Sequence, residues 1–419
     1  MKRKFFTFPS AAVLTSILLS ACIGLIPLDD EPITGEYGPQ VSLQEHQTQT
    51  FEALWKAIQN DYIYYETTDF EWDDLRSDYQ KQIDEGLSSI EFDDLMRSLE
   101  TDLPADSFIY QTRSERIETD MGDNSTYEGI GAFVGFDPEP NPHIVLLSVI
   151  SGSPAERAGL KAHDSILAID GKPIFLEEGI RAVERVRGPS GSTVTLTVRS
   201  PGKAERDIKV QRGKLVSSAQ LEAYQITGTK FGYLLFPPIA YEGLLEDVVT
   251  SMQAFTTNQK IEGLILDLRI ASSSSGWPLE GLFTMFYNGA IGEFYNRNNK
   301  QLLQVKGQDV FSSQSVPLII LVGRNTQGYS EILAGSLQMH KRAVIIGDNT
   351  NGTIETSSPF FLPNGARIYI ETTSFVLPNG EKIGYNGIKP DVKIEAGWDE
   401  VIPNQDPVIE TAIQLLEAE

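Results

Sequence analysis

The sequence predicts an α/β fold for the largest part of the chain, preceded by a helical segment and a β-rich segment. Three observations support this prediction. Unbroken apolar runs such as 317–323 alternate with helical runs such as 332–339, which is typical of largely parallel strands in an α/β core. Residues 45–103 carry apolar side chains at helical spacing, and residues 193–199 alternate apolar and polar as a strand does.

The first residues have the pattern of an export signal. Three basic residues follow Met1, an apolar run continues to Leu19, and Leu19-Ser-Ala-Cys22 is similar to a bacterial lipobox. The apolar run is about fifteen residues, shorter than the roughly 20 of a membrane-spanning helix, so a span is the weaker alternative. The sequence therefore predicts a signal peptide over 1–21 and lipidation of Cys22, the only cysteine. Residues 22–44 have the composition of a flexible tether. The signal peptide and the lipidated Cys22 together predict a protein of the bacterial cell envelope that is lipid-anchored and faces the periplasm or the cell exterior.

Composition excludes several classes of partner. The 419-residue chain has a formal charge of −24, and such a surface repels nucleic acid and anionic lipid headgroups. Lipid rather than charge is therefore expected to hold the protein at the membrane. The four histidines, at positions 46, 143, 163 and 340, do not have the spacing of a metal site, and no phosphate loop or nucleotide-binding fingerprint occurs. The sequence thus predicts no metal, no cofactor and no nucleic-acid partner.

Residues 45–115 are predicted to form an N-terminal helical subdomain. Phe51, Leu54, Trp55 and Ile58 fall on one helical stripe, and later apolar residues repeat this spacing. Helices with such stripes bury them against one another.

Residues 128–213 have the sequence pattern of a small β-domain. Ile150-Ser-Gly-Ser-Pro-Ala-Glu-Arg-Ala-Gly-Leu160 is followed by Asp164-Ser-Ile-Leu-Ala-Ile-Asp-Gly-Lys-Pro-Ile174. These segments resemble a PDZ domain. Consecutive backbone N–H groups of such a domain can bind a terminal carboxylate while the ligand pairs as an added strand. The alternative is a PDZ fold that only spaces two subdomains. The resemblance implies a carboxylate-binding loop made of Gly129, Ile130, Gly131, Ala132 and Phe133.

Residues 214–403 are predicted to form the α/β core. Apolar runs such as 263–269 indicate buried strands, and helical patterns separate them. Two Pro-Asn-Gly turns, at Pro363 and Pro378, bracket a strand pattern that suits antiparallel pairing. The last residues, 404–419, are predicted to form a C-terminal helix.

A predicted strand, a tight turn and a helix follow one another within this core. The turn is Thr326-Gln-Gly-Tyr-Ser-Glu-Ile332, and the helix ends with Gln338-Met-His-Lys-Arg-Ala343. A strand-to-helix turn suits a nucleophile and an oxyanion, because the helix N-terminus presents backbone N–H groups. Both segments resemble the nucleophile motif of the S41 peptidases, the tail-specific or carboxyl-terminal processing proteases. The resemblance implies a ClpP/crotonase-like α/β S41 peptidase core with an inserted PDZ β-domain and an N-terminal helical subdomain.

The chain departs from the family pattern where the chemistry would occur. The family's nucleophilic serine falls on Gly328, and its lysine base falls on Thr353. A Ser-Lys dyad needs a hydroxyl and an amine that is neutral near pH 7, but Gly328 has no hydroxyl and Thr353 has no amine. The acid expected before His340 is Met339, and the serine-rich segment 270–276 replaces the glycine-rich oxyanion loop. No catalytic residue is therefore predicted.

The sequence predicts a surface-anchored S41 peptidase-like lipoprotein that is not catalytic and binds peptides or unfolded protein C-termini through its PDZ domain, as a binding or regulatory module. The alternative is an active S41 serine-type, C-terminal processing endopeptidase with a rearranged nucleophile such as Ser330.

Ser330 is interpreted as a helix cap, because a shift of two residues misplaces the attacking oxygen by several ångströms. His340 is interpreted as offsetting the helix dipole, and Asp267 as a turn residue.

Overall fold

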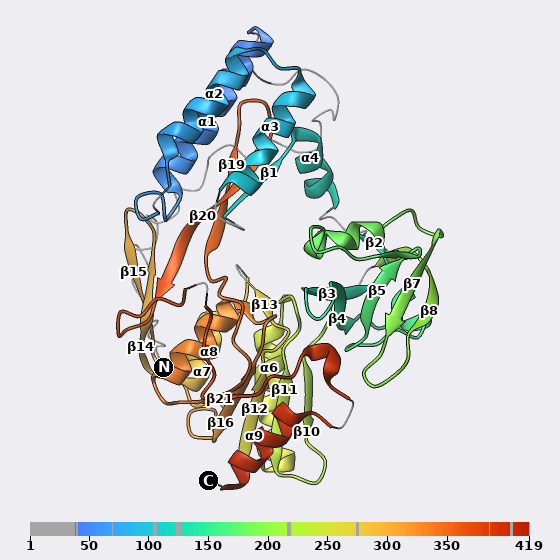
Figure 1. The fold of residues 1–419 in the computed structure, drawn as a ribbon. Helices are drawn as coiled ribbons and strands as arrows, with labels where there is room; N and C mark the ends of the chain where they lie inside the picture. Colours follow the sequence, from blue (N-terminus) through green and yellow to red (C-terminus); the bar gives the residue numbers. More distant parts are fainter. Residues whose placement is uncertain are drawn as a thin grey trace, which may run out of the picture.

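Figure 1 shows the computed structural model, which describes residues 38, 41–68, 70–103, 107–122, 127–215, 219–273, 276–384, 386–402 and 405–418. A helical lobe lies at one end, an α/β core lies at the other, and a β-domain lies beside the core. The predicted fold class is confirmed. The predicted signal peptide and Cys22 lie outside the described residues. Among the described residues, no helix is long and apolar enough to cross a membrane.

The helical lobe buries the apolar stripes that the sequence indicates. Ser42 and Ser88 accept hydrogen bonds from backbone N–H groups and begin the first and third helices, as N-caps do. Phe51, Leu54 and Trp55 are almost completely buried in one cluster. The helices of this lobe are α1 (Leu43–Asp61), α2 (Trp72–Asp84), α3 (Ser89–Asp102) and α4 (Arg113–Gly122).

A long strand from the second half of the chain completes this lobe. Ile368 and Ile370 of β20 (Arg367–Val376) lie in the same apolar cluster as the helices. The sheet runs in the order β1-β20-β14-β15, and β19 also pairs with β20. The remaining strands of this sheet are β1 (Phe108–Gln111), β14 (Gly289–Tyr295), β15 (Lys300–Val305) and β19 (Thr356–Phe361).

The β-domain is an antiparallel sheet with strand order β3-β4-β5-β7-β8, and β6 also pairs with β5. Strand β3 is at its edge. The elements of this domain are β2 (Tyr127–Gly129), β3 (Ala132–Asp137), β4 (His143–Val149), α5 (Pro154–Arg157), β5 (Ser165–Ile169), β6 (Lys172–Pro173), the 3₁₀ helix η2 (Gly179–Arg185), β7 (Thr193–Arg199), β8 (Arg206–Gln211) and β9 (Gly213–Leu215), which pairs with β2.

Strand β4 is buried on both faces. Ile144 and Leu146 lie in the core of the β-domain, whereas Val145 and Leu147 lie in a second cluster with Ile270 of the α/β core. Successive side chains of a strand point to opposite faces, so the unbroken apolar run in β4 serves two interfaces. The β-domain is therefore packed on the α/β core and not merely linked to it.

The α/β core contains a six-stranded sheet in the order β10-β11-β12-β16-β18-β21, parallel from β11 onward. Apolar residues on one face, such as Leu264 and Ile320, pack with α6, α7 and α8. Those on the other face, such as Ile265 and Ile319, pack with α9. The elements are β10 (Glu222–Gln225), β11 (Phe231–Leu235), α6 (Leu244–Ala254), the π-helical turn η3 (Phe255–Gln259), β12 (Gly263–Asp267), α7 (Leu279–Phe286), β16 (Leu318–Val322), α8 (Tyr329–Met339), β18 (Val344–Gly347), β21 (Val392–Lys393), the 3₁₀ turn η4 (Trp398–Glu400) and α9 (Pro407–Ala418).

Candidate functional site

The turn between β16 and α8 is held by buried hydrogen bonds. The hydroxyl of Thr326 donates to the carbonyl oxygen of Leu268 at 2.8 Å and accepts from the N–H of Gly323 at 3.0 Å. Two short parallel strands follow, because β17 (Gln327–Gly328) pairs with β13 (Ser272–Ser273). The turn thus has a defined position at the end of the sheet.

Gly328 occupies the predicted nucleophile position directly before α8. Its φ of 69° and ψ of −128° lie where residues with a side chain are strained. Its N–H donates to the carbonyl oxygen of Thr353 at 2.9 Å. The structure therefore brings together the two positions that would hold a Ser-Lys dyad, but Gly328 has no side-chain hydroxyl and Thr353 has no amine.

Glu331 connects these two positions, and sequence reasoning missed this role. Its buried carboxylate accepts from the N–H groups of Gly328 at 3.0 Å, Thr353 at 3.1 Å and Gly352 at 2.7 Å, and from the hydroxyl of Thr350 at 2.5 Å. Burial raises the pKa of Glu331, although these hydrogen bonds oppose the shift. An acidic residue three positions after the N-cap of a helix was the available sequence signal, because such a residue often caps the helix.

Ser330 points into the protein. The residue is 0% exposed, and its Oγ lies 2.8 Å from the carbonyl oxygens of both Ala271 and Gln327. A hydroxyl held between two acceptors has to break these contacts before it can attack a bound peptide. The interpretation of Ser330 as a helix cap is wrong, because Gly328 is the N-cap of α8 and the Ser330 hydroxyl donates to carbonyl oxygens instead of accepting from an N–H group of the helix.

The side chains that adjoin Gly328 and Thr353 through Asn351, Ser272 and Gln327 are neutral. Thr353 donates its hydroxyl hydrogen to Oδ1 of Asn351, and Ser272 donates to Oε1 of Gln327 at 3.0 Å. Among the residues that the structure describes, no group of three or more His, Cys, Asp or Glu side chains could hold a metal ion. The described turn offers hydrogen bonds and not a reactive group.

His340 lies at the C-terminus of α8 and stacks on Tyr287 at 4.2 Å. Its Nδ1 is 2.9 Å from the hydroxyl of Tyr287. Burial lowers the pKa of His340 below the usual 6.5. This shift disfavours the charged ring that the helix-dipole interpretation of His340 requires.

A cavity of about 1250 Å³ lies between the β-domain and the C-terminal ends of the core strands. This volume exceeds the roughly 300–1000 Å³ typical of small-molecule sites. The cavity reaches the dyad positions through Gln327 and Thr353, and residues 134–140 of the β-domain line its other side. The arrangement has room for a peptide-sized ligand.

The predicted carboxylate-binding loop joins β2 to the edge strand β3. Gly131 has a φ of 82°, which favours glycine, and the carbonyl oxygens of Ile130 and Gly131 accept from Ala155 at 2.7 Å and Ile150 at 3.0 Å. Ile130 lies in the β-domain core, and Phe133 contacts the cluster that faces the α/β core. The structure therefore gives Ile130 and Phe133 packing roles, and ligand binding by Gly129–Phe133 stays a prediction.

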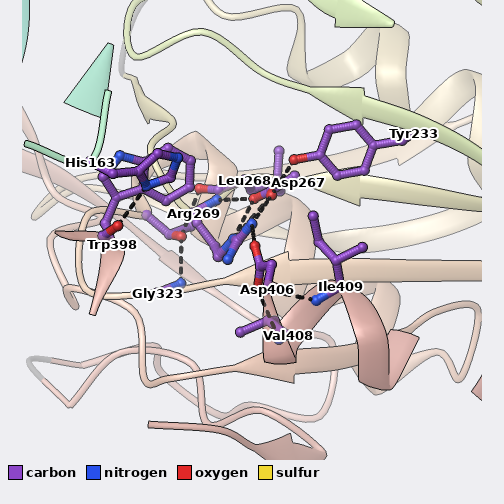
Figure 2. A network of polar contacts seen from close by, with 11 residues as sticks. His163, Tyr233, Asp267, Leu268, Arg269, Gly323, Trp398, Asp406, Val408 and Ile409 are labelled. Atoms are coloured by element: carbon purple, nitrogen blue, oxygen red, sulfur yellow. Dashed lines mark hydrogen bonds and ion pairs between the residues drawn. The ribbon is translucent and has the colours of Figure 1, made fainter. Parts of the chain in front are cut away.

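Asp267 has a larger role than that of a turn residue. Its Oδ1 accepts from the N–H of Arg269 at 3.0 Å, as predicted for a turn, and its Oδ2 also pairs with the Arg269 guanidinium at 2.6 Å. Asp406 pairs with the same guanidinium at 2.7 Å, and the hydroxyl of Tyr233 donates to Asp267 at 2.7 Å (Figure 2). This buried network lies beside the cavity.

The fold and the turn between β16 and α8 define a peptidase architecture. Comparisons with known proteins give its family. The chain belongs to peptidase family S41: residues 230–394 match the S41 family, residues 145–200 match a PDZ domain and residues 43–99 match the Tricorn protease C1 domain. The β-domain is therefore called the PDZ domain below.

Among its relatives is the carboxyl-terminal-processing protease of Picosynechococcus sp., 32% identical over 71% of this chain and 68% of that protein. A carboxy-terminal-processing protease of Bartonella bacilliformis is 30% identical over 66% of this chain and 64% of its own length. The chain thus spans about two thirds of these relatives.

Solved structures share the fold. The photosystem II D1 C-terminal processing protease has a TM-score of 0.64 at 22% identity and covers 90% of this chain and 98% of its own. Mature CPAF has a TM-score of 0.57 at 12% identity and covers 90% of this chain and 98% of its own.

Proposed function

We propose that this protein is a non-catalytic member of the S41 family that binds peptides or unfolded protein C-termini through its PDZ domain, as a binding or regulatory module. In this proposal the chain is a lipoprotein of the bacterial cell envelope, attached through Cys22 and facing the periplasm or the cell exterior. The observation that carries the proposal is the pair Gly328 and Thr353, which lie together without the groups that a Ser-Lys dyad requires.

The position of Ser330 supports the absence of catalysis. A catalytic serine needs a base within hydrogen-bond reach, whereas both neighbours of the Ser330 hydroxyl are backbone carbonyl oxygens. Displacement of an attacking atom by about 1 Å can cost roughly 10²-fold in rate. Ser330 lies two residues beyond the position that the family uses.

The edge strand β3 supports peptide binding. An edge strand has backbone groups that can pair with an extended peptide, and the loop before β3 is the one that the PDZ resemblance predicts to bind a carboxylate. The large cavity beside β3 leaves space for the ligand to continue toward the core. These features require no reactive group.

A second candidate function is an active serine-type C-terminal processing peptidase that uses Ser330. The names of the relatives favour it, because they are processing proteases. It requires the Ser330 hydroxyl to leave the carbonyl oxygens of Ala271 and Gln327 and to find a base.

One experiment separates the two candidates. The purified protein is incubated with an unfolded reporter that ends in small apolar residues, and fragments and binding are both measured. The binding proposal predicts saturable association without fragments, and at least about tenfold weaker binding after Gly131→Val, because valine is strained at this φ. Fragments that disappear in a Ser330→Ala variant would establish the peptidase instead.

The anchor has its own test. Cells that express the protein are labelled with a radioactive fatty acid and fractionated. We expect label and membrane association in the natural chain and loss of both in Cys22→Ala, because this variant lacks the only thiol of the chain. Unlabelled natural protein would refute the anchor without affecting the binding proposal.

A further inference from the structure

Asn351 and Gly352 form an Asn-Gly pair directly before Thr353. In such a pair the backbone nitrogen of the glycine can attack the side-chain amide carbon of the asparagine and close a five-membered succinimide ring. The attack needs a base for the proton on the nitrogen and a donor for the negative charge that develops on the amide oxygen. The structure places a carboxylate and a hydroxyl at these two points.

The carboxylate lies at the glycine nitrogen. The N–H of Gly352 donates to Oε1 of Glu331 at 2.7 Å. This distance lies within the reach of roughly 2.6–3.2 Å that a general base requires. Glu331 is buried, and burial raises its pKa, which favours uptake of a proton. Glu331 is therefore placed to take the proton that ring closure removes from Gly352.

The hydroxyl lies at the oxygen of the amide that would be attacked. Thr353 donates its hydroxyl hydrogen to Oδ1 of Asn351. Nδ2 of the same side chain donates to the carbonyl oxygen of Arg324 at 3.3 Å, so both ends of the amide have a partner. A donor that is already on the oxygen stabilises the charge that forms there during the attack.

Asn351 also has access to water. Its side chain is exposed and lines the large cavity described above, whereas Gly352 is buried. Ring closure releases ammonia, and opening of the succinimide consumes water. The cavity gives ammonia a way out and water a way in, while the base remains inside the protein.

Four other Asn-Gly pairs in the chain allow an internal comparison. They begin at Asn288, Asn364, Asn379 and Asn386. In the last three pairs the glycine N–H groups donate to backbone carbonyl oxygens, those of Leu362 at 2.9 Å, Leu377 at 2.8 Å and Gly384 at 2.8 Å. A backbone carbonyl oxygen accepts a hydrogen bond but is too weak a base to take the proton. Asn351-Gly352 differs from these three pairs by the carboxylate at its glycine nitrogen.

We propose that Asn351 is a site of self-catalysed deamidation, with Glu331 as the base and Thr353 as the donor to the amide oxygen. The nitrogen of Gly352 forms a bond with Cγ of Asn351 while its proton passes to Glu331. The bond between Cγ and Nδ2 then breaks, and Nδ2 leaves as ammonia with that proton. Water opens the succinimide, and residue 351 becomes aspartate or isoaspartate. In total, one water molecule is consumed and one ammonia molecule is released.

The product changes the turn that holds the dyad positions. Either product adds a negative charge to the wall of the cavity. In the isoaspartate form the main chain runs through the side-chain carbon of residue 351 and is one carbon atom longer. Since Gly352 and Thr353 both donate to Glu331, the longer chain weakens these contacts. This modification does not depend on whether the dyad positions are catalytic.

The test follows all five Asn-Gly pairs in one molecule. The full chain without its predicted signal segment is incubated at neutral pH in water enriched in heavy oxygen, both folded and unfolded in urea. Peptide mapping by mass spectrometry measures the conversion of each asparagine, and incorporation of heavy oxygen separates this reaction from deamidation during sample preparation. The variants are Glu331→Gln and Thr353→Val. The matched control is Thr411→Val, which removes a hydroxyl from α9.

In the folded protein Asn351 is expected to deamidate at least about tenfold faster than Asn364, Asn379 and Asn386. In urea all five pairs should react within about threefold of one another, because the base and the donor are no longer held in place. Thr353→Val is expected to slow the reaction at Asn351 at least about fivefold, and Thr411→Val is expected to leave it unchanged.

Glu331→Gln separates a base from a purely structural role. Loss of the base is expected to slow the reaction at Asn351 at least about tenfold, whereas a turn that is merely loosened would let the ring close faster. A faster reaction in folded Glu331→Gln therefore overturns the proposal.

The natural protein also decides the question without any variant. The proposal is overturned if folded Asn351 reacts no faster than Asn364, Asn379 and Asn386, or if its advantage persists in urea. An unchanged rate in folded Thr353→Val overturns it equally. If either variant is unfolded, the comparison of folded and unfolded natural protein remains decisive.

Discussion

The backbone N–H of Gly328 donates a hydrogen bond to the carbonyl oxygen of Thr353 at 2.9 Å. The resemblance to the S41 motif predicts these residues at the nucleophile and base positions of a dyad, and Glu331 accepts hydrogen bonds from both backbones. The scaffold thus keeps the two positions in register although the reacting groups are absent. A carboxylate that organises the turn is compatible with a binding site as well as with an enzyme.

Because the scaffold is preserved, the dyad can be rebuilt. The combination Gly328→Ser with Thr353→Lys is expected to give slow hydrolysis of the unfolded reporter. The serine costs stability of order 1–3 kcal/mol, since position 328 has a positive φ. Gly328→Ala with Thr353→Lys carries the same strain without a hydroxyl and is expected to produce no fragments. Equal fragment yields from the two combinations would contradict this prediction.

Replacement of Glu331 is expected to destabilise the turn. In the natural protein the Glu331 carboxylate accepts hydrogen bonds from backbone N–H groups. In Glu331→Gln the side-chain NH₂ group would face some of these N–H donors and could not accept from them, so we expect a loss of about 2–4 kcal/mol in the free energy of unfolding. Urea denaturation measures the loss. Glu91→Gln is the matched control, because Glu91 also caps a helix at the third position but is exposed, and its effect should be much smaller. Equal effects of the two variants would show that Glu331 has no special role.

Arg269 is expected to be essential for stability. Arg269→Met leaves Asp267 and Asp406 buried without their cation, and we expect a loss of about 3–5 kcal/mol in the free energy of unfolding. The control is Lys230→Met, which removes an exposed pair with Glu262 and should cost about 0–1 kcal/mol. A loss below about 1 kcal/mol for Arg269→Met would contradict the network as described.

The contact between His143 and Asp399 is expected to depend on pH. Burial opposes a charged His143, but hydrogen bonds to Asp399 and to the carbonyl oxygen of Asn141, with the nearby Asp137, outweigh it and raise the pKa above 6.5. Burial likewise opposes a charged Asp399, but hydrogen bonds with His143 and Ser165 outweigh it and hold the pKa below 3.8. Arg199 also faces this carboxylate.

The sign of the pH dependence follows from these directions. The raised pKa of His143 gives stability that is complete below pH 6.5 and is lost as the pH rises through the raised value. The lowered pKa of Asp399 gives stability that is present above pH 3.8 and is lost as the pH falls through the lowered value. The free energy of unfolding lost in Asp399→Asn should therefore be larger at about pH 5.5 than at about pH 9. A loss that is the same at both values would contradict the charged pair.

The resemblance to the S41 family implied the dyad positions, and the motif could be recognised because Gly328 lies in one continuous strand-turn-helix segment and Thr353 follows after a single strand. The α/β core was predicted correctly because each of its apolar strand and helix patterns is likewise continuous in the sequence. The sequence could not predict the contact of His143 with Asp399, because these residues are 256 positions apart. Nor did it indicate that β20 completes the helical lobe, since the strand pattern of β20 does not reveal its partners.

The central claim is that no serine of this protein attacks a carbonyl or phosphonyl centre, and the direct test is covalent labelling with a fluorophosphonate probe. The natural protein is incubated with the probe at neutral pH and examined by intact-mass spectrometry, with an active carboxyl-terminal processing protease as the positive control. The account predicts an unchanged mass for this protein and complete labelling of the control. An adduct that maps to Ser330 and is absent from Ser330→Ala would contradict the account.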